Sequence, residues 1–88
     1  MASYDIAFKP SVEKDLRSLP KSTVARVMEH IENLKVNPLP RQAAKLSGTE
    51  RLYRIRVGDY RIVYKVDTEA RLVIVHYVRH RRDVYRAL

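Results

Sequence analysis

The stretch "RLYRIRVGDYRIVYK", residues 51–65, places four arginines and a lysine around a Gly-Asp turn. Apolar residues alternate with polar ones on both sides of the turn, a period that is typical of β-strands with one buried face. Gly-Asp suits a two-residue hairpin loop, so the segment predicts a β-hairpin. The loop fixes these opposite pairs: Val57 with Tyr60, Arg56 with Arg61, Ile55 with Ile62, and Arg54 with Val63.

Three arginines, Arg54, Arg56 and Arg61, therefore share one face of the predicted hairpin. Like charges opposite each other destabilise a sheet by roughly a few tenths of a kcal/mol, so folding does not explain them. A phosphate group does, because the planar fork of a guanidinium matches phosphate oxygens in pairs. The alternative is that strand arginines only keep the protein soluble and discourage edge pairing.

The rest of the chain predicts an α+β fold. Residues 4–8 form a short strand, and Ser11 caps a first helix that Pro20 ends. A second helix covers residues 21–35, where apolar residues recur at helical spacing. A third sheet strand covers residues 71–78, which gives the order β-α-α-β-β-β with a possible last turn of helix. Two N-terminal helices then pack on one face of a small, mostly antiparallel sheet.

The second hairpin decides which side chains face the helices. A loop centred on Thr68-Glu69 sets Arg61 opposite His76 and Val63 opposite Ile74. The face with the arginines then stays open and positive. The other face carries the core and receives the helices. Its residues are predicted to be Tyr53, Ile55, Val57, Tyr60, Ile62, Tyr64, Val66, Val73, Val75 and Tyr77.

Length and composition restrict the function further. The 88 residues indicate one domain, 1–88, and 18 Lys+Arg against 10 Asp+Glu give a net charge of +8. Such an excess attracts nucleic acid or an acidic protein. The absence of cysteine excludes disulfides and thiolate chemistry, and the three histidines show no metal-ligand spacing. No secretory signal and no membrane-length apolar run is visible, so we expect a cytoplasmic protein without metal, cofactor or membrane.

The residues also limit the chemistry to reactions in which the substrate brings its own nucleophile. No carboxylate pair, glycine-rich phosphate loop or nucleophile motif is visible. RNA carries its own nucleophile in the 2′-hydroxyl, and positive groups can stabilise the charge that develops on the phosphate. The terminal segment adds more candidates of this kind: Arg79, His80, Arg81 and Arg82, with Tyr85 as a ring on which a base can stack.

The chain resembles the RelE/ParE superfamily of toxins from type II toxin-antitoxin systems. "KLSG", "LYRIRVGDYRIVYKV" and "HYVRHRRDVYR" carry the resemblance, which covers nearly the whole chain. It implies the RelE-like microbial ribonuclease fold. It also implies an endoribonuclease that enters the ribosomal A site, cleaves messenger RNA without a metal by 2′-hydroxyl attack, and inhibits translation.

The resemblance implies roles for particular residues. Arg61 and Arg81 stabilise the scissile phosphate, and Tyr85 orients or stacks on the messenger. Arg54 and Arg56 stand where the best-known RelE enzymes have lysines.

This departure from the family pattern changes the expected base. Arginine keeps its proton at ordinary pH, so Arg54 and Arg56 hold phosphate and do not act as bases. Arg79 and Arg82 are further RNA-binding residues. His80 becomes the leading acid-base residue and His76 the reserve.

The resemblance also implies a partner and two alternatives. A cognate antitoxin with a flexible acidic segment covers the basic surface, and DNA is contacted only through that complex. One alternative is a ParE-like inhibitor of DNA gyrase without nuclease activity. The other is a weakened toxin that acts as a co-repressor.

Overall fold

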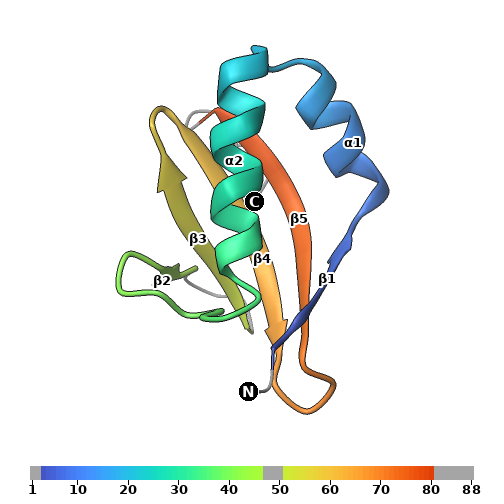
Figure 1. Ribbon diagram of the computed structural model, residues 1–88, viewed down its shortest axis with the longest axis vertical. Helices are drawn as coiled ribbons and strands as arrows, with labels where there is room; N and C mark the ends of the chain where they lie inside the picture. The colour runs from blue at the N-terminus through green and yellow to red at the C-terminus, as the bar shows by residue number, and fades with distance from the viewer. Residues whose placement is uncertain (1–2, 47–50, 81–88) are drawn as a thin grey trace.

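The computed structural model describes residues 3–46 and 51–80, which form an α+β fold in one layer of helices and one sheet (Figure 1). The chain order confirms the predicted fold class. A short strand, β2, is added to the predicted order between the second helix and the hairpin. The elements are β1 (Asp5–Phe8), α1 (Pro10–Arg17), α2 (Lys21–Asn33), β2 (Ala44–Lys45), β3 (Leu52–Val57), β4 (Tyr60–Asp67) and β5 (Leu72–His80).

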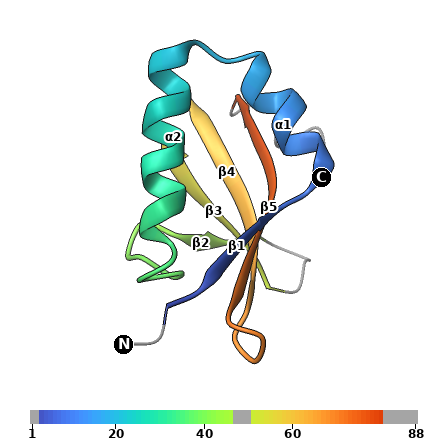
Figure 2. The ribbon, with the colours of Figure 1, turned by 45° about the vertical axis from the view of Figure 1, so that its right-hand side comes forward.

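The strands form one sheet in the order β1-β5-β4-β3-β2. β1 runs parallel to β5, and the other neighbours are antiparallel, as the prediction of a mostly antiparallel sheet requires. The pairing of β1 with β5 ends where Phe8 lies opposite Val75. From that point the chain turns into α1, which lies beside the later half of β5 (Figure 2).

The predicted start of the first helix was wrong by two residues, because Ser11 was expected to be its N-cap. α1 begins at Pro10, and Lys9 is its N-cap, without a side-chain bond. Proline fits the first helical position because the N–H that it lacks would have no partner there. Ser11 therefore does not cap the helix, and its hydroxyl donates to the carbonyl of His76 at 3.1 Å.

The hydrophobic core lies between the two helices and the sheet. Val12 of α1 and Val27 and Ile31 of α2 pack on most of the sheet residues predicted for this face. Tyr77 is not among them, and Val78, which was not predicted, takes part in the core. Tyr64 is fully buried, and its hydroxyl donates to the carbonyl of Pro38 at 2.8 Å. Neither α1 nor α2 is long and apolar enough to cross a membrane, and they are the only helices in the described part.

The register of the first hairpin is as predicted. Val57 lies opposite Tyr60, and Arg56 lies opposite Arg61. Gly58 opens the turn with a φ of +61°, a conformation that glycine adopts without a steric penalty. A local signal therefore sufficed to align β3 with β4.

The predicted register of the second hairpin was wrong. Arg61 lies opposite Arg79, not His76, and Val63 lies opposite Tyr77, not Ile74. The loop covers residues 68–71, so its centre lies one residue later than predicted. The register also shifts between Val63 and Tyr64 at a β-bulge. The extra residue on β5 is His76, which has no partner on β4.

The bulge also moves Tyr77 to the face of the sheet that is turned away from the helices. We call this surface the arginine face, and the register and strand alternation give it Arg54, Arg56, Arg61, Val63, Lys65, His76, Tyr77 and Arg79. It is less open than predicted. Val63 is fully buried against Leu46, and Arg61 is only 6% exposed.

Candidate nucleic-acid interface

Three arginines lie side by side across three strands of the sheet. Arg56 of β3 lies opposite Arg61 of β4, and Arg61 lies opposite Arg79 of β5. Neighbouring strands are separated by about 4.8 Å, so the Cα atoms of the three arginines lie in a row across the sheet. We call these three residues the arginine row.

Arg61, in the middle of the row, is buried without a counter-charge from the residues that the structure describes. Its Nη1 donates to the carbonyls of Tyr60, at 3.1 Å, and Gly58, at 3.5 Å. Its Nε is buried and has no hydrogen-bond partner among the described residues. No ion pair links Arg61 to a carboxylate in the described segments 3–46 and 51–80. The site therefore holds a positive charge that the described residues leave uncompensated.

The two arginines of β3 extend this charge toward solvent. Arg56 is exposed and Arg54 is half-buried. Neither is ion-paired within the part of the chain that the structure describes. Both are placed on the face and in the strand that the sequence predicted, next to Arg61.

Arg79 differs from the other two arginines because it has a carboxylate beside it. Its Nε lies 3.3 Å from Oδ1 of Asp15, on α1. The guanidinium carbon also lies 4.3 Å from the centre of the Tyr77 ring, a distance at which cation and ring attract each other. Arg79 belongs to β5, whereas the sequence analysis placed it after the end of the third sheet strand.

The bulge places His76 on the arginine face as well. Its Nε2 is buried and finds no hydrogen-bond partner within residues 3–46 and 51–80. Burial lowers the pKa of His76 below its ordinary value, and the ammonium groups of Lys9 and Lys65 lower this pKa further. Together with Lys9, Ser11 and Tyr77, His76 lines a cleft of about 400 Å³. The lowered pKa favours the uncharged form of the imidazole.

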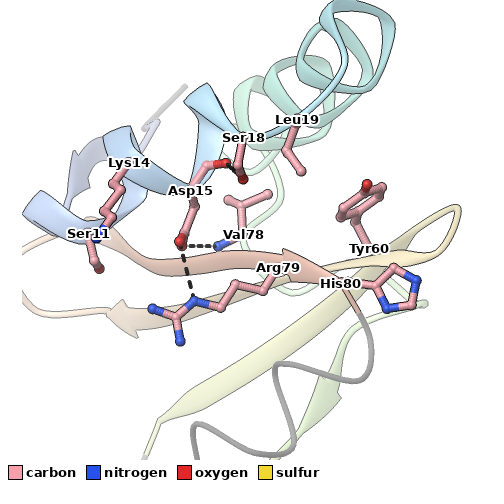
Figure 3. A pocket seen from close by; sticks show the side chains of 9 residues that line it. All are labelled: Ser11, Lys14, Asp15, Ser18, Leu19, Tyr60, Val78, Arg79 and His80. Atoms are coloured by element: carbon pink, nitrogen blue, oxygen red, sulfur yellow. Dashed lines mark hydrogen bonds and ion pairs between the residues drawn. The ribbon is translucent and has the colours of Figure 1, made fainter.

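The structure does not bring His80 together with Arg61. His80 lies opposite Tyr60, so strand alternation turns it toward the helix side of the sheet. Its ring meets the Tyr60 ring edge-on at 5.7 Å. Both rings line a cleft of about 620 Å³ between α1 and the ends of β4 and β5 (Figure 3).

Three of the predicted residues, Arg81, Arg82 and Tyr85, lie outside the described residues. The sequence analysis also missed two that contact the row. Asp15 belongs to a helix more than sixty positions before Arg79, and Tyr77 was assigned to the core face. No sequence signal identifies either contact, because both depend on how β5 and α1 meet. In the described segments no group of three His, Asp or Glu side chains is arranged to hold a metal ion.

Comparisons with known proteins agree with this fold. The chain is 36% identical to the toxin RelG of Mycobacterium tuberculosis over 90 residues, which covers 94% of this chain and 97% of the relative. The RelE-RelB complex of Pyrococcus horikoshii contains a chain with a TM-score of 0.80 and 35% identity, covering 92% of this chain and 97% of that one.

The RelB-RelE antitoxin-toxin complex from Methanococcus jannaschii gives a TM-score of 0.77 at 30% identity, covering 93% and 98% of the two chains. The family model that matches is described as the ParE toxin of the type II toxin-antitoxin system parDE, and it spans residues 6–85. With nearly its whole length matched, the chain belongs to this family of type II toxins, in the branch of its RelE-named relatives.

Proposed function

We propose that this toxin is a ribosome-dependent messenger-RNA endonuclease and that the arginine row holds the scissile phosphate. The observation that carries the proposal is the environment of Arg61. Arg61 is 6% exposed, and among the described residues its Nε has no hydrogen-bond partner and no carboxylate pairs with it. An unpaired buried ion costs roughly several kcal/mol. An RNA phosphate at the exposed edge of the guanidinium supplies the missing negative charge.

The proposed reaction uses the 2′-hydroxyl of the RNA as nucleophile. The 2′-oxygen loses its proton to a base and attacks the adjacent phosphorus. The bond from phosphorus to the 5′-oxygen breaks, and that oxygen takes a proton from an acid. The products are a 2′,3′-cyclic phosphate and a 5′-hydroxyl. Arg61, flanked by Arg56 and Arg79, stabilises the charge that develops on the phosphate oxygens.

Acid-base work falls to groups other than the arginines, which stay protonated. His76 shares the arginine face, and its lowered pKa favours the uncharged form. His80 lies on the helix side, beside Tyr60. In the proposal, Arg54 binds the RNA backbone with Arg82, Arg81 stabilises the phosphate, and Tyr85 stacks on a base. These assignments for residues beyond His80 rest on resemblance alone.

The proposed partner of the toxin is a cognate antitoxin. Solved relatives are RelE chains in complex with RelB, among them the RelB-RelE antitoxin-toxin complex from Methanococcus jannaschii. An acidic antitoxin segment neutralises the arginine face electrostatically and keeps RNA away from it. DNA is then contacted through the antitoxin, and the complex works in the cytoplasm.

Inhibition of DNA gyrase is the second candidate, because the matching family model is described as a ParE toxin. A gyrase inhibitor binds a protein and does not require a buried guanidinium that can bind a phosphate. The two candidates separate in a supercoiling assay with purified gyrase. A chain that blocks supercoiling and leaves messengers intact overturns the nuclease proposal. A harmless chain, inert in both assays, favours the co-repressor.

The direct test is a cell-free translation reaction with a defined messenger, followed by primer extension. The nuclease proposal expects new 5′ ends at fixed codons. Arg61→Met should reduce their rate of formation by about 10²- to 10³-fold. Arg26→Ala, which removes one exposed charge from α2, is the matched control. A single 2′-deoxy substitution at the cleaved position should abolish cleavage there, and cleavage that persists refutes 2′-hydroxyl attack.

A further inference from the structure

Helix α1 replaces a strand as the partner of the later half of β5. Beyond Val75 no β1 residue pairs with β5. There the hydroxyl of Ser11 donates to the carbonyl of His76 at 3.1 Å. The backbone N–H of Val78 donates to Oδ2 of Asp15, also at 3.1 Å. Side chains of α1 thus satisfy backbone groups that an unpaired sheet edge would leave open.

Asp15 uses its second carboxylate oxygen for Arg79. Oδ1 accepts a hydrogen bond from Nε of Arg79 at 3.3 Å, while the Tyr77 ring lies against the guanidinium at 4.3 Å. The side chains of Asp15 and Arg79 are only 12% and 30% exposed. Figure 3 shows the two terminal nitrogens of Arg79 pointing away from Asp15. The contact therefore restrains the guanidinium without occupying its outer donors.

We propose that Asp15 is the positioning residue of the arginine row, which holds Arg79 opposite Arg61 with both terminal nitrogens available to an RNA phosphate. This inference rests on the proposed RNA-binding function. A free arginine side chain loses rotamer entropy when it binds an anion. Asp15 and Tyr77 already restrict the rotamers of Arg79 in the folded protein. RNA binding therefore costs less side-chain entropy.

A carboxylate near a phosphate site has two opposing effects, and their signs make the proposal testable. As a negative charge, Asp15 repels RNA, so its neutralisation should tighten binding. As a positioning group, Asp15 orders Arg79, so its neutralisation should weaken binding. Asp15→Asn separates the effects well. The amide oxygen can still accept from the N–H of Val78, while the charge-assisted contact to Arg79 is lost.

The experiment measures binding of a short single-stranded RNA, made uncleavable with 2′-O-methyl groups, to the full chain over a range of salt concentrations. Asp15→Asn should weaken binding by about 3- to 10-fold. The slope of the logarithm of the binding constant against the logarithm of the salt concentration should fall in magnitude by about 0.7, the value for one phosphate contact on a single strand. Arg79→Ala should act the same way, and the Asp15→Asn/Arg79→Ala double variant should bind no more weakly than Arg79→Ala.

Matched variants separate this inference from the function on which it rests. Glu13→Gln removes a carboxylate from the same helix, 74% exposed and paired with Arg17, and should leave binding unchanged or tighter. If the Asp15→Asn variant binds RNA as well as wild type or more tightly, the positioning role is refuted. This holds even if the melting temperature of the variant is lower. Additive losses in the double variant overturn it too. Binding that survives Arg61→Met contradicts the proposed function instead.

Discussion

Arg61 of β4 and Arg79 of β5 lie directly opposite each other on the arginine face, but only Arg79 has a described carboxylate beside it. The two charges therefore differ in what stabilises them. Asp15 compensates the charge of Arg79 within the folded chain, whereas we expect the charge of the buried Arg61 to be compensated by a bound anion. This asymmetry leads to the first prediction.

Arg61→Met should abolish most cleavage without destabilising the fold. Methionine keeps an unbranched apolar stem and removes the buried charge, so the free energy of unfolding should stay within about 1 kcal/mol of wild type or rise. Denaturant unfolding measures this change. Arg61→Ala is a poorer test because it also empties buried volume. A loss above about 2 kcal/mol for Arg61→Met would show that the guanidinium has a structural role.

His76 should make the folded state less stable as the pH falls. Its pKa is lowered in the folded protein, so between the folded value and the unfolded value of about 6.5 the unfolded chain binds more protons. The free energy of unfolding therefore rises with pH through this window and is reduced below it. His76→Gln should flatten the dependence, as unfolding at a series of pH values would reveal. An unchanged slope would assign the effect to another group.

Tyr64 should contribute to the free energy of unfolding mainly through the burial of its ring. It is fully buried, and burial raises the pKa of its hydroxyl above the ordinary value. Tyr64→Ala should cost about 3 to 5 kcal/mol of unfolding free energy. Tyr64→Phe removes only the bond to the carbonyl of Pro38 and should cost about 1 kcal/mol. Equal losses in thermal or denaturant unfolding would contradict this division.

Gly58 should be sensitive to substitution because of its backbone angle. At a φ of +61° an alanine is strained by about 1 to 2 kcal/mol. A Cβ placed there meets Arg26 Nη1 at 3.7 Å, an ordinary contact, so collision adds little. Gly58→Asn should be better tolerated than Gly58→Ala, since asparagine adopts this region more readily. Equal melting temperatures for the two variants would refute the backbone explanation.

Most of the fold could be predicted from local patterns. The stripe of Val27 and Ile31 placed α2 on the core, and the period of two identified β3 and β4. The Gly-Asp turn aligned these strands residue by residue, because a two-residue loop leaves no freedom of register. The turn therefore predicts that Arg56 and Arg61 lie opposite each other, and the structure confirms it.

The third member of the row could not be predicted. The loop after Asp67 is longer than two residues, and such a loop permits several registers. The bulge at His76 then turned Tyr77 away from the core and brought Arg79 opposite Arg61. Neither feature has a local signal, since each reflects how β5 packs against β4 and α1.

The sequence by itself determined that this chain is a basic α+β domain with arginines facing one another across a hairpin. Those features depend on residues a few positions apart, whose spacing dictates periodicity and turn type. Only the tertiary structure decided that Arg61 is buried, that His80 is turned from it, and that Asp15 holds Arg79. These relationships join segments far apart in the chain, and their energies depend on burial and packing, which no local pattern encodes.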